Sequence, residues 1–243
     1  MKFSIIVPWY GKRTERLVLF NKTTLSVLQQ TLLRSDYELI LVKDADASVS
    51  AFEAVADKII IMPHRALFNK SWFINTAARQ VSHSWFFLLD ADLLLDMDHL
   101  KAISSYIDTT TTHVFIPFNV CKWMLEDGSN RLVDYTKLDI FGLGFCIKKN
   151  DFFDSGGMCE NFDGYGGEDG DIYERHKGYT KHMTYQVTHQ YHDHPEQIDF
   201  KWNRDLIQIC RRRQGDIKGK MMAIKNQIGN SLHPTLINYM DLL

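Results

Sequence analysis

The stretch Trp85-Phe86-Phe87-Leu88-Leu89-Asp90-Ala91-Asp92 decides the fold class. Its five consecutive apolar residues predict a strand that is buried on both faces, as in a parallel sheet. Similar runs predict three more buried strands, at Phe3–Pro8, Glu38–Lys43 and Lys58–Pro63. Helical spacing separates these runs, in Arg16–Arg34, Ser50–Ala56 and Lys70–Val81. This alternation with short connections predicts an α/β fold, an open sheet flanked by helices.

Composition and charge restrict the class of protein further. The chain has 243 residues, of which 45% are hydrophobic and 24% charged, as in a globular domain that needs no disulfides. Lysine plus arginine number 28, against 30 for aspartate plus glutamate. This balance excludes nucleic acid as the main partner, because phosphate binding needs a basic excess.

Cysteine spacing and apolar patterning predict a cytoplasmic protein. The four cysteines form no CxxC pair, which favours reduced thiols over a disulfide framework. The N-terminal residues have no signal-peptide pattern, and no run of 18 uninterrupted apolar residues occurs. The basic run Arg211-Arg212-Arg213 predicts a solvated helix face. The alternative is peripheral contact with the anionic inner face of a membrane that presents a lipid-linked acceptor.

Asp90 and Asp92 directly follow the fourth predicted strand. Ligands of open α/β sheets bind at this carboxyl edge of the strands. Two carboxylates at positions i and i+2 can reach one divalent cation and its waters. In isolation such a pair is usually two solvated loop acids. Its place after a buried strand favours a site for a metal and a diphosphate.

A glycine-rich acidic segment follows, Asp163-Gly164-Tyr165-Gly166-Gly167-Glu168-Asp169-Gly170-Asp171. The glycines predict a tight loop, and the acids predict the start of a helix, whose dipole favours negative charge there. An acidic helix cap explains one or two of these acids, but not four that are interleaved with glycines. A carboxylate in such a loop can act as general base towards an attacking hydroxyl.

Histidines form a third cluster, with His189, His192 and His194 close to Asp193. A single histidine is more often a surface or core residue than a ligand. Several histidines in a chain that also has the Asp90-Ala91-Asp92 (DxD) pair favour metal ligation. His192 is the first choice as ligand and His194 the second. Imidazole nitrogen combined with carboxylate oxygen suits Mn²⁺ better than Ca²⁺.

Taken together, these motifs resemble glycosyltransferases. The donor half of the β-1,4-galactosyltransferase family is matched by Phe68-Asn69-Lys70, Asn75, Phe87–Leu93 and Met97-Asp98-His99. That family's C-terminal signature resembles Phe141-Gly142, Gly156-Gly157, Tyr165–Asp171 and Arg175. Tyr191-His192-Asp193 is similar to the metal-binding region of bacterial chondroitin-polymerase-type transferases, and polypeptide N-acetylgalactosaminyltransferases are more distant relatives.

The resemblance implies a GT-A (Rossmann-like) fold with an open mixed sheet, which binds a UDP-sugar with Mn²⁺ or Mg²⁺. It implies that Asp92 and His192 hold the metal, with Asp90 supporting the metal or the ribose. Asp169 matches the catalytic base, and Glu168 matches a contact to the acceptor sugar. The residues implied for nucleotide-sugar binding are Pro8, Tyr10, Asp44, Arg65, Asp90 and Gly167. Tyr165 and Asp163 stand where the galactosyltransferases have tryptophans, and would contact the acceptor.

One GT-A catalytic domain is expected over residues 1–243. Its parts would be a nucleotide-sugar half (1–95), an acceptor-binding and catalytic half (96–200) and a helical extension (201–243). The expected reaction moves a hexose or N-acetylhexosamine from a UDP-sugar donor to a hydroxyl of a glycan or lipid-linked glycan, with inversion. Two alternatives are a retaining transferase and a non-catalytic module that binds UDP-sugar or metal. A sugar nucleotidyltransferase is disfavoured, because Pro8-Trp9-Tyr10-Gly11-Lys12 has a single glycine.

Overall fold

A computed structural model describes residues 2–11, 14–47, 49–65, 67–164, 166–192 and 203. Strands and helices alternate through the first part of the chain as the sequence predicts. They are β1 (Phe3–Trp9), α1 (Thr14–Leu28), β2 (Tyr37–Asp44), α2 (Ser50–Glu53), β3 (Lys58–Met62), α3 (Lys70–Gln80) and β4 (Trp85–Leu89). Several residues singled out from the sequence lie outside the described residues: Lys12, Tyr165, Asp193, His194 and Arg211-Arg212-Arg213. Of the expected helical extension (201–243), only residue 203 is described.

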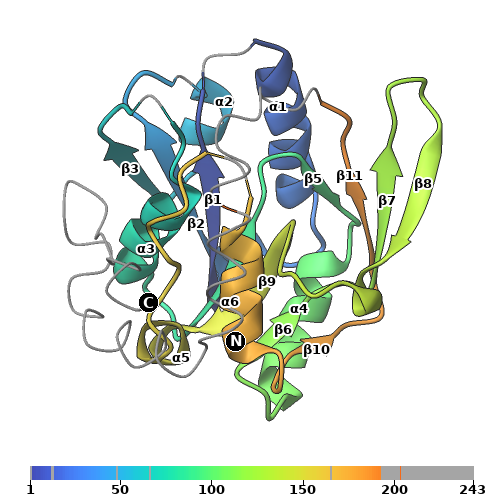
Figure 1. The fold of residues 1–243 in the computed structure, drawn as a ribbon. Helices are drawn as coiled ribbons and strands as arrows, with labels where there is room; N and C mark the ends of the chain where they lie inside the picture. Colours follow the sequence, from blue (N-terminus) through green and yellow to red (C-terminus); the bar gives the residue numbers. More distant parts are fainter. Residues whose placement is uncertain are drawn as a thin grey trace.

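The larger sheet has seven strands in the order β10-β6-β9-β4-β1-β2-β3 (Figure 1). Parallel pairing of β1 with β2 and β4, and of β2 with β3, brings the carboxyl ends of four strands to one edge. β9 (Gly144–Lys148) runs antiparallel to both β4 and β6 (Val114–Ile116), and β10 is Lys181–His182. The sheet is therefore mixed, as the resemblance implies, although the alternating pattern by itself predicts parallel strands.

A second sheet of four strands, in the order β5-β11-β7-β8, was not predicted from the sequence. Its strands are β5 (Leu93–Leu95), β11 (Gln186–His189), β7 (Val120–Met124) and β8 (Asn130–Asp134). The antiparallel pair of β5 and β11 places His189 opposite Leu93. Because Leu93 follows Asp92 directly, this pairing brings the second acid of the DxD pair to the histidine segment.

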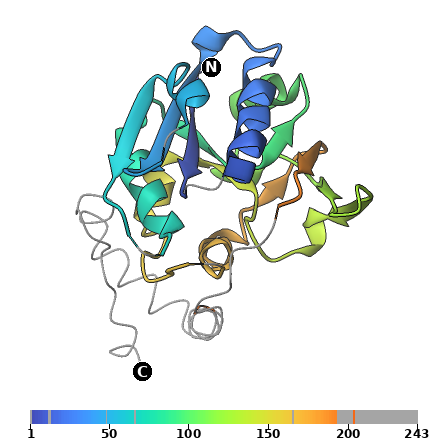
Figure 2. The same ribbon diagram turned by 90° about the horizontal axis from the view of Figure 1, so that it is seen from above.

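Helices lie on both sides of the seven-stranded sheet (Figure 2). α1 lies on one side, and α3 and α6 (Glu168–His176) lie on the other. The remaining helical elements are η1 (Arg34–Asp36), α4 (His99–Thr109), η2 (Tyr135–Lys137) and α5 (Lys149–Asp154). α1 ends at Leu28, six residues before the predicted end, and the chain then turns so that the Thr31 N–H donates to the Met97 carbonyl at 2.8 Å. None of the helices that the structure describes is long and apolar enough to cross a membrane.

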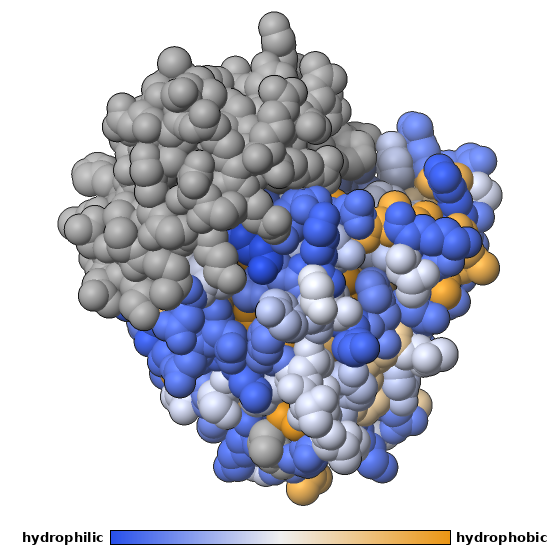
Figure 3. All heavy atoms as spheres, turned by 60° about the horizontal axis from the view of Figure 1, so that its bottom comes forward, coloured by the Kyte–Doolittle hydropathy of each residue, from blue (hydrophilic) through white to orange (hydrophobic). Residues whose placement is uncertain are grey.

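The surface drawn in Figure 3 is mainly hydrophilic, and its hydrophobic side chains gather at the side where the β7–β8 hairpin lies. Exposed large hydrophobic residues of this hairpin are Met124, Leu125 and Leu132. The buried core, by contrast, is continuous between the two sheets and includes Leu93 of β5, Cys121 of β7 and Val187 of β11. The second sheet is therefore packed onto the first, and only its outer hairpin presents apolar side chains to solvent.

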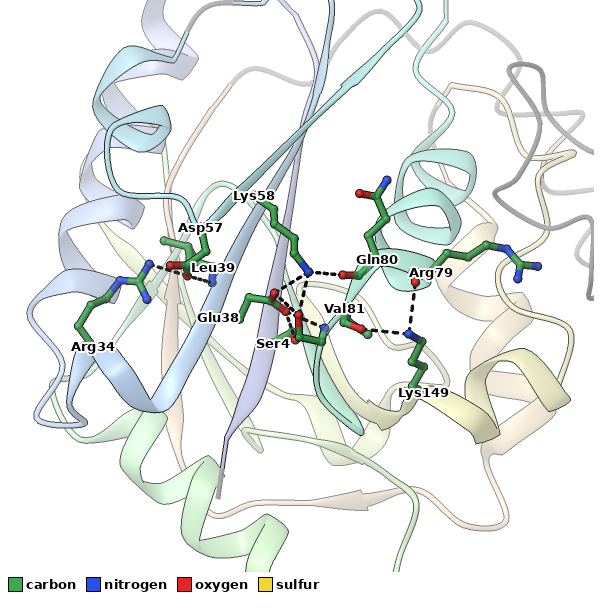
Figure 4. Close-up of polar contacts among 11 residues, drawn as sticks. Ser4, Arg34, Glu38, Leu39, Asp57, Lys58, Arg79, Gln80, Val81 and Lys149 are labelled. Carbon is green, nitrogen blue, oxygen red and sulfur yellow. Dashed lines mark hydrogen bonds and ion pairs between the residues drawn. The ribbon is translucent and has the colours of Figure 1, made fainter.

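Glu38 is buried at the amino ends of the strands, opposite the edge that carries Asp90 and Asp92 (Figure 4). Its carboxylate accepts hydrogen bonds from the Ser4 hydroxyl and from the Ser82 N–H and hydroxyl, at 2.9 and 2.7 Å for Ser82. The Lys58 ammonium lies 2.8 Å away. Burial on its own would raise the pKa of Glu38, but the hydrogen bonds from Lys58, Ser4 and Ser82 outweigh it and lower this pKa to about 2.

We expect Glu38 to make the fold sensitive to acid. Because the folded pKa lies below the ordinary value of 4.5, the ionised carboxylate stabilises the fold above pH 4.5, and this contribution is lost as the pH falls towards about 2. Glu38→Gln should lower the free energy of unfolding at pH 7 by about 2 kcal/mol. It should also flatten the pH dependence below 4.5, as measured by urea unfolding. Glu126→Gln, which changes an exposed acid, is the control, and equal acid sensitivity of both variants would contradict the prediction.

Candidate active site

Asp92, His189 and His192 come together at the junction of the two sheets. Asp92 Oδ2 lies 2.9 Å from His192 Nε2, and Asp92 Oδ1 lies 3.7 Å from His189 Nε2. One ligand atom from each of these residues lies within 4.8 Å of those from the other two. Sequence analysis predicted Asp92 and His192 as ligands. His189 belonged to the predicted cluster but was not chosen, because the pairing of β11 with β5 was not foreseen.

The chemistry of these three residues fits a divalent metal ion. Asp92 Oδ1 is buried and accepts no hydrogen bond from the residues that the structure describes. Burial would raise the pKa of Asp92, but the hydrogen bond from His192 and the charges of His189, His192 and Arg16 outweigh it and lower this pKa. An ionised carboxylate beside two imidazoles is a ligand set that suits a borderline ion such as Mn²⁺.

Neighbouring side chains hold the histidine segment in place. The Trp123 ring of β7 stacks on His189 with 4.2 Å between ring centroids and an interplanar angle of 23°. The Gln190 amide donates to the Leu19 carbonyl and the Thr23 hydroxyl of α1, at 3.0 and 3.1 Å. The two histidines are therefore fixed against both the second sheet and α1.

Lys70, the first residue of α3, lies among three carboxylates. Its Nζ is 3.0 Å from Asp90 Oδ1, 3.3 Å from Asp169 Oδ2 and 3.9 Å from Glu168 Oε1. None of the four side chains is more than 20% exposed. Asp90 thus contacts Lys70 and does not belong to the group of Asp92, His189 and His192. A role for Asp90 in metal or ribose binding stays a prediction.

Burial and mutual repulsion alter the protonation of these acids. Burial, opposed by Lys70 and reinforced by Asp169, raises the pKa of Asp90 to about 6. Burial and the charge of Asp169, opposed by Lys70, raise the pKa of Glu168 to about 7. For Lys70, burial would lower the pKa, but the charges of Asp169, Asp90 and Glu168 outweigh it and raise it. A buried cluster that shares one cation in this way is typical of an active site.

Two backbone positions next to these acids have positive φ. Leu143 has a φ of 74°, uncommon for a residue with a side chain, and its carbonyl accepts from the Asp90 N–H at 3.1 Å. Gly167, immediately before α6, has a φ of 103°. A Cβ at Gly167 would lie 2.5 Å from the Phe162 ring, so only glycine fits there. Leu143 therefore fixes the backbone beside Asp90, and Gly167 allows the tight turn from which α6 begins.

Arg175 anchors the helix that carries Glu168 and Asp169. The Arg175 guanidinium is buried and donates to the carbonyls of Ser155 and Gly157, at 2.7 and 2.6 Å. It also donates to the Asp171 carboxylate at 2.7 Å. Arg175 and Asp171 therefore have structural contacts, whereas Glu168 and Asp169 of the same helix face Lys70.

A third group forms around the ends of β1, β2 and β3, where nucleotide binding was predicted. Asp44 is 2% exposed, and His64 Nδ1 lies 3.0 Å from its carboxylate. The Tyr10 ring stacks on Phe68 at 5.0 Å, and its hydroxyl donates to the Arg65 carbonyl at 2.6 Å. The structure thus brings the predicted Tyr10, Asp44 and Arg65 together and adds His64. Pro8 lies within β1, opposite Val42.

Two buried amides, at the N-cap of α3 and within it, hold the chain that leads into the glycine-rich segment. Asn69, the N-cap of α3, donates to the Glu160 carbonyl at 2.7 Å and to Asp163 Oδ1 at 2.9 Å. Arg65 Nη1 lies 3.2 Å from the same Asp163 oxygen. The Asn75 amide donates to the Met158 carbonyl and the Glu160 carboxylate, both at 2.8 Å. Asp163, predicted to contact the acceptor, therefore contacts Arg65, which was predicted to bind the nucleotide-sugar.

Comparison with known proteins identifies the family. Residues 4–159 match the model of glycosyl transferase family 2. The chain belongs to this family. Residues 130–194 of this family 2 chain also match the model described as the N-terminal domain of galactosyltransferase. The resemblance to glycosyltransferases and the α/β fold class are thereby confirmed.

Solved structures of TarS from S. aureus share the fold of this family 2 chain. The full TarS structure has a TM-score of 0.63 at 15% identity, and the match covers 95% of the present chain but 44% of TarS. TarS 1–349 in complex with UDP-GlcNAc has a TM-score of 0.63 at 16% identity, with 93% and 72% coverage. TarS 1–349 in complex with UDP has a TM-score of 0.60 at 16% identity. The chain thus spans less than half the length of full TarS, and no curated protein matches significantly.

Proposed function

We propose that the chain transfers a hexose or N-acetylhexosamine from a UDP-sugar to a hydroxyl of a glycan or lipid-linked glycan, in a metal-dependent reaction with inversion. One observation carries this proposal. Asp92 belongs to a group that fits a metal, whereas Asp90, two residues earlier, contacts Lys70 in the group that contains Asp169. Asp90 and Asp92 therefore connect the group of Asp92, His189 and His192 to the buried acidic group around Lys70. The UDP-GlcNAc and UDP complexes of TarS support the choice of donor.

Asp92, His189 and His192 would hold Mn²⁺ or Mg²⁺ beside the donor. When bound, such an ion neutralises the negative charge of a departing diphosphate. The buried Asp44 carboxylate, with Tyr10 close by, would accept hydrogen bonds from the nucleoside. Arg65 would add positive charge on the same side. Pro8 and Gly167 would line the donor pocket through the backbone.

Asp169 would act as the general base. A carboxylate that takes the proton from the acceptor hydroxyl raises its nucleophilicity as it attacks the anomeric carbon. Attack from the face opposite UDP inverts the configuration and needs no enzyme nucleophile. Glu168, beside it at the start of α6, would contact the acceptor sugar. Asp163 and Tyr165 would complete the acceptor side.

A cytoplasmic location of the protein stays a prediction.

The first test is the release of UDP from a panel of UDP-sugars, measured with Mn²⁺ and then with EDTA. We expect turnover on one donor with Mn²⁺ and its loss with EDTA. NMR of the product gives the anomeric configuration and so distinguishes inversion from retention. Binding of UDP with Mn²⁺ but no release from any donor, with or without glycan acceptors, would favour a non-catalytic binding module. Failure to bind UDP at all would contradict the proposal.

Lys70→Met should move the acidic limb of the pH–rate profile to higher pH. The positive charge of Lys70 lowers the pKa of Asp90 and of Glu168. Without it, repulsion between the carboxylates raises both pKa values further. The ratio of UDP release at pH 6 to that at pH 8.5 should fall by about tenfold relative to the unmodified protein. Lys70→Arg keeps the charge and is the matched control. An acidic limb that Lys70→Met leaves in place would contradict this prediction.

A further inference from the structure

Arg16, in the first turns of α1, lies against the metal group proposed above. Its Nη2 is 3.0 Å from His192 Nδ1. The His192 side chain is 11% exposed, so the contact is largely shielded from water. The Gln190 amide bonds to the Leu19 carbonyl, which lies one helical turn after Arg16, and to Thr23. The approach of Arg16 to His192 is therefore fixed by the packing of α1 on the end of β11.

The direction of this hydrogen bond has a chemical consequence. A guanidinium can only donate, so Nδ1 of His192 accepts, and the proton of the neutral imidazole is then on Nε2. Nε2 faces Asp92 Oδ2 at 2.9 Å. A metal held by Nε2 needs the electron pair that this proton occupies, and the proton then belongs on Nδ1, where it would face Arg16. The contact with Arg16 and coordination through Nε2 therefore exclude one another.

Charge acts in the same direction. Arg16 lies 3.0 Å from His192, so its positive charge is next to the proposed ligands. A divalent cation that enters without a donor therefore meets a fixed positive charge beside its site. A diphosphate carries the negative charge that a guanidinium binds well, through paired N–H donors.

We propose that Arg16 couples metal binding to binding of the donor diphosphate. Without a nucleotide, the guanidinium stays on His192 and opposes the bare ion. The diphosphate draws the guanidinium to itself, and His192 becomes available to the metal. By linkage, nucleotide and metal then raise the affinity for each other by the same factor. This inference rests on the proposed metal site and adds to it the order in which the ligands assemble.

Calorimetric titration with Mn²⁺, with and without saturating UDP, tests the coupling. The coupling factor is the gain in Mn²⁺ affinity that UDP produces. In Arg16→Gln we expect Mn²⁺ alone to bind more tightly and the coupling factor to fall by about tenfold. Arg16→Lys keeps the charge but offers no paired N–H donors, so its coupling factor should lie between those of Arg16→Gln and the unmodified protein. Lys22→Gln makes the same charge change at an exposed position of α1 and should leave the coupling factor unchanged.

Three results would overturn the inference, and they are distinguishable. An unmodified protein that binds Mn²⁺ neither alone nor with UDP would overturn the proposed metal site, and this inference with it. An unmodified protein that binds Mn²⁺ with UDP, but shares its coupling factor with Arg16→Gln, would overturn the role of Arg16 alone. Equal losses in Lys22→Gln and Arg16→Gln would likewise overturn it, because the effect would then be one of general charge.

Discussion

Asp169→Asn should lower the rate of sugar transfer by about 10³-fold while UDP binding stays within about twofold. An asparagine has nearly the same shape as the aspartate but cannot accept the proton of the acceptor hydroxyl. The side chains of Tyr10, Asp44 and Arg65, which are predicted to contact the nucleotide, come from other elements, the ends of β1 and β2 and the turn after β3. The change should therefore appear in kcat, with little change in the affinity for UDP. Initial rates of UDP release and calorimetric titration with UDP measure the two quantities.

The matched control for this prediction lies on the same helix. Glu174→Gln removes a charge from α6, where Glu174 pairs with Lys177 at 2.8 Å. This variant should keep most of its turnover. If Asp169→Asn retained a tenth of the rate of the unmodified protein or more, Asp169 would not be the base, and Glu168 would be the next carboxylate to replace.

Asp92→Asn should abolish metal-dependent turnover, because Asp92 is the only carboxylate that the described residues contribute to the group of Asp92, His189 and His192. Asp92 supplies its negative charge, and His189 and His192 supply only neutral nitrogen ligands when they hold a metal. We expect Mn²⁺ affinity, measured with UDP present, to fall by at least about 100-fold. This is more than the loss of a residue that only supports a metal ligand would cause. UDP binding in EDTA should change little. A loss confined to kcat, with unchanged Mn²⁺ affinity, would contradict this assignment.

A second group of acidic residues and histidine provides a control for Asp92→Asn. Among the described residues, Asp44, Asp46 and His64 also have ligand atoms within 4.8 Å of one another. Asp46 is 45% exposed, whereas Asp92 is 24% exposed. Asp46→Asn should therefore leave Mn²⁺ affinity within about twofold, because exposed acids are well solvated without an ion. Equal losses of Mn²⁺ affinity in Asp46→Asn and Asp92→Asn would contradict the assignment of the metal to Asp92, His189 and His192.

Local sequence pattern predicted the first half of the fold and the segments of the site. Each of the four predicted strands is a short apolar run, and the acids and glycines that follow them are local features of the chain. The prediction that all four are buried is wrong for β3, because it lies at the edge of the sheet and exposes Ile59 and Ile61. The helix that begins at Glu168 was predicted for the same reason, since acids after a glycine loop favour a helix start. Such features need no knowledge of which distant segment lies beside them.

Pairing between distant segments could not be predicted in the same way. Lys70 meets Asp169 across 99 positions of the chain, and Arg16 meets His192 across 176. β5 has three residues and β11 has four, too few for a clear period of alternation. Their pairing is what moves His189 into the metal group. The roles of His189 and Arg16 thus depend on the second sheet and on α1, and that of Lys70 depends on the approach of α3 to α6.

The strands of the larger sheet have a consequence for how such a chain can diversify. β4 belongs to the first 95 residues, yet its neighbour β9 comes from residues 144–148 and separates it from β6. Asn69 and Asn75 also belong to the first 95 residues. Their buried amides donate hydrogen bonds to the segment from Met158 to Asp163. Fragments cut after residue 95 would each lose half of one sheet and leave these amides unpaired, so we expect neither to fold alone. New donor or acceptor preferences would then arise by changes in loops around an indivisible framework, and not by recombination of interchangeable halves.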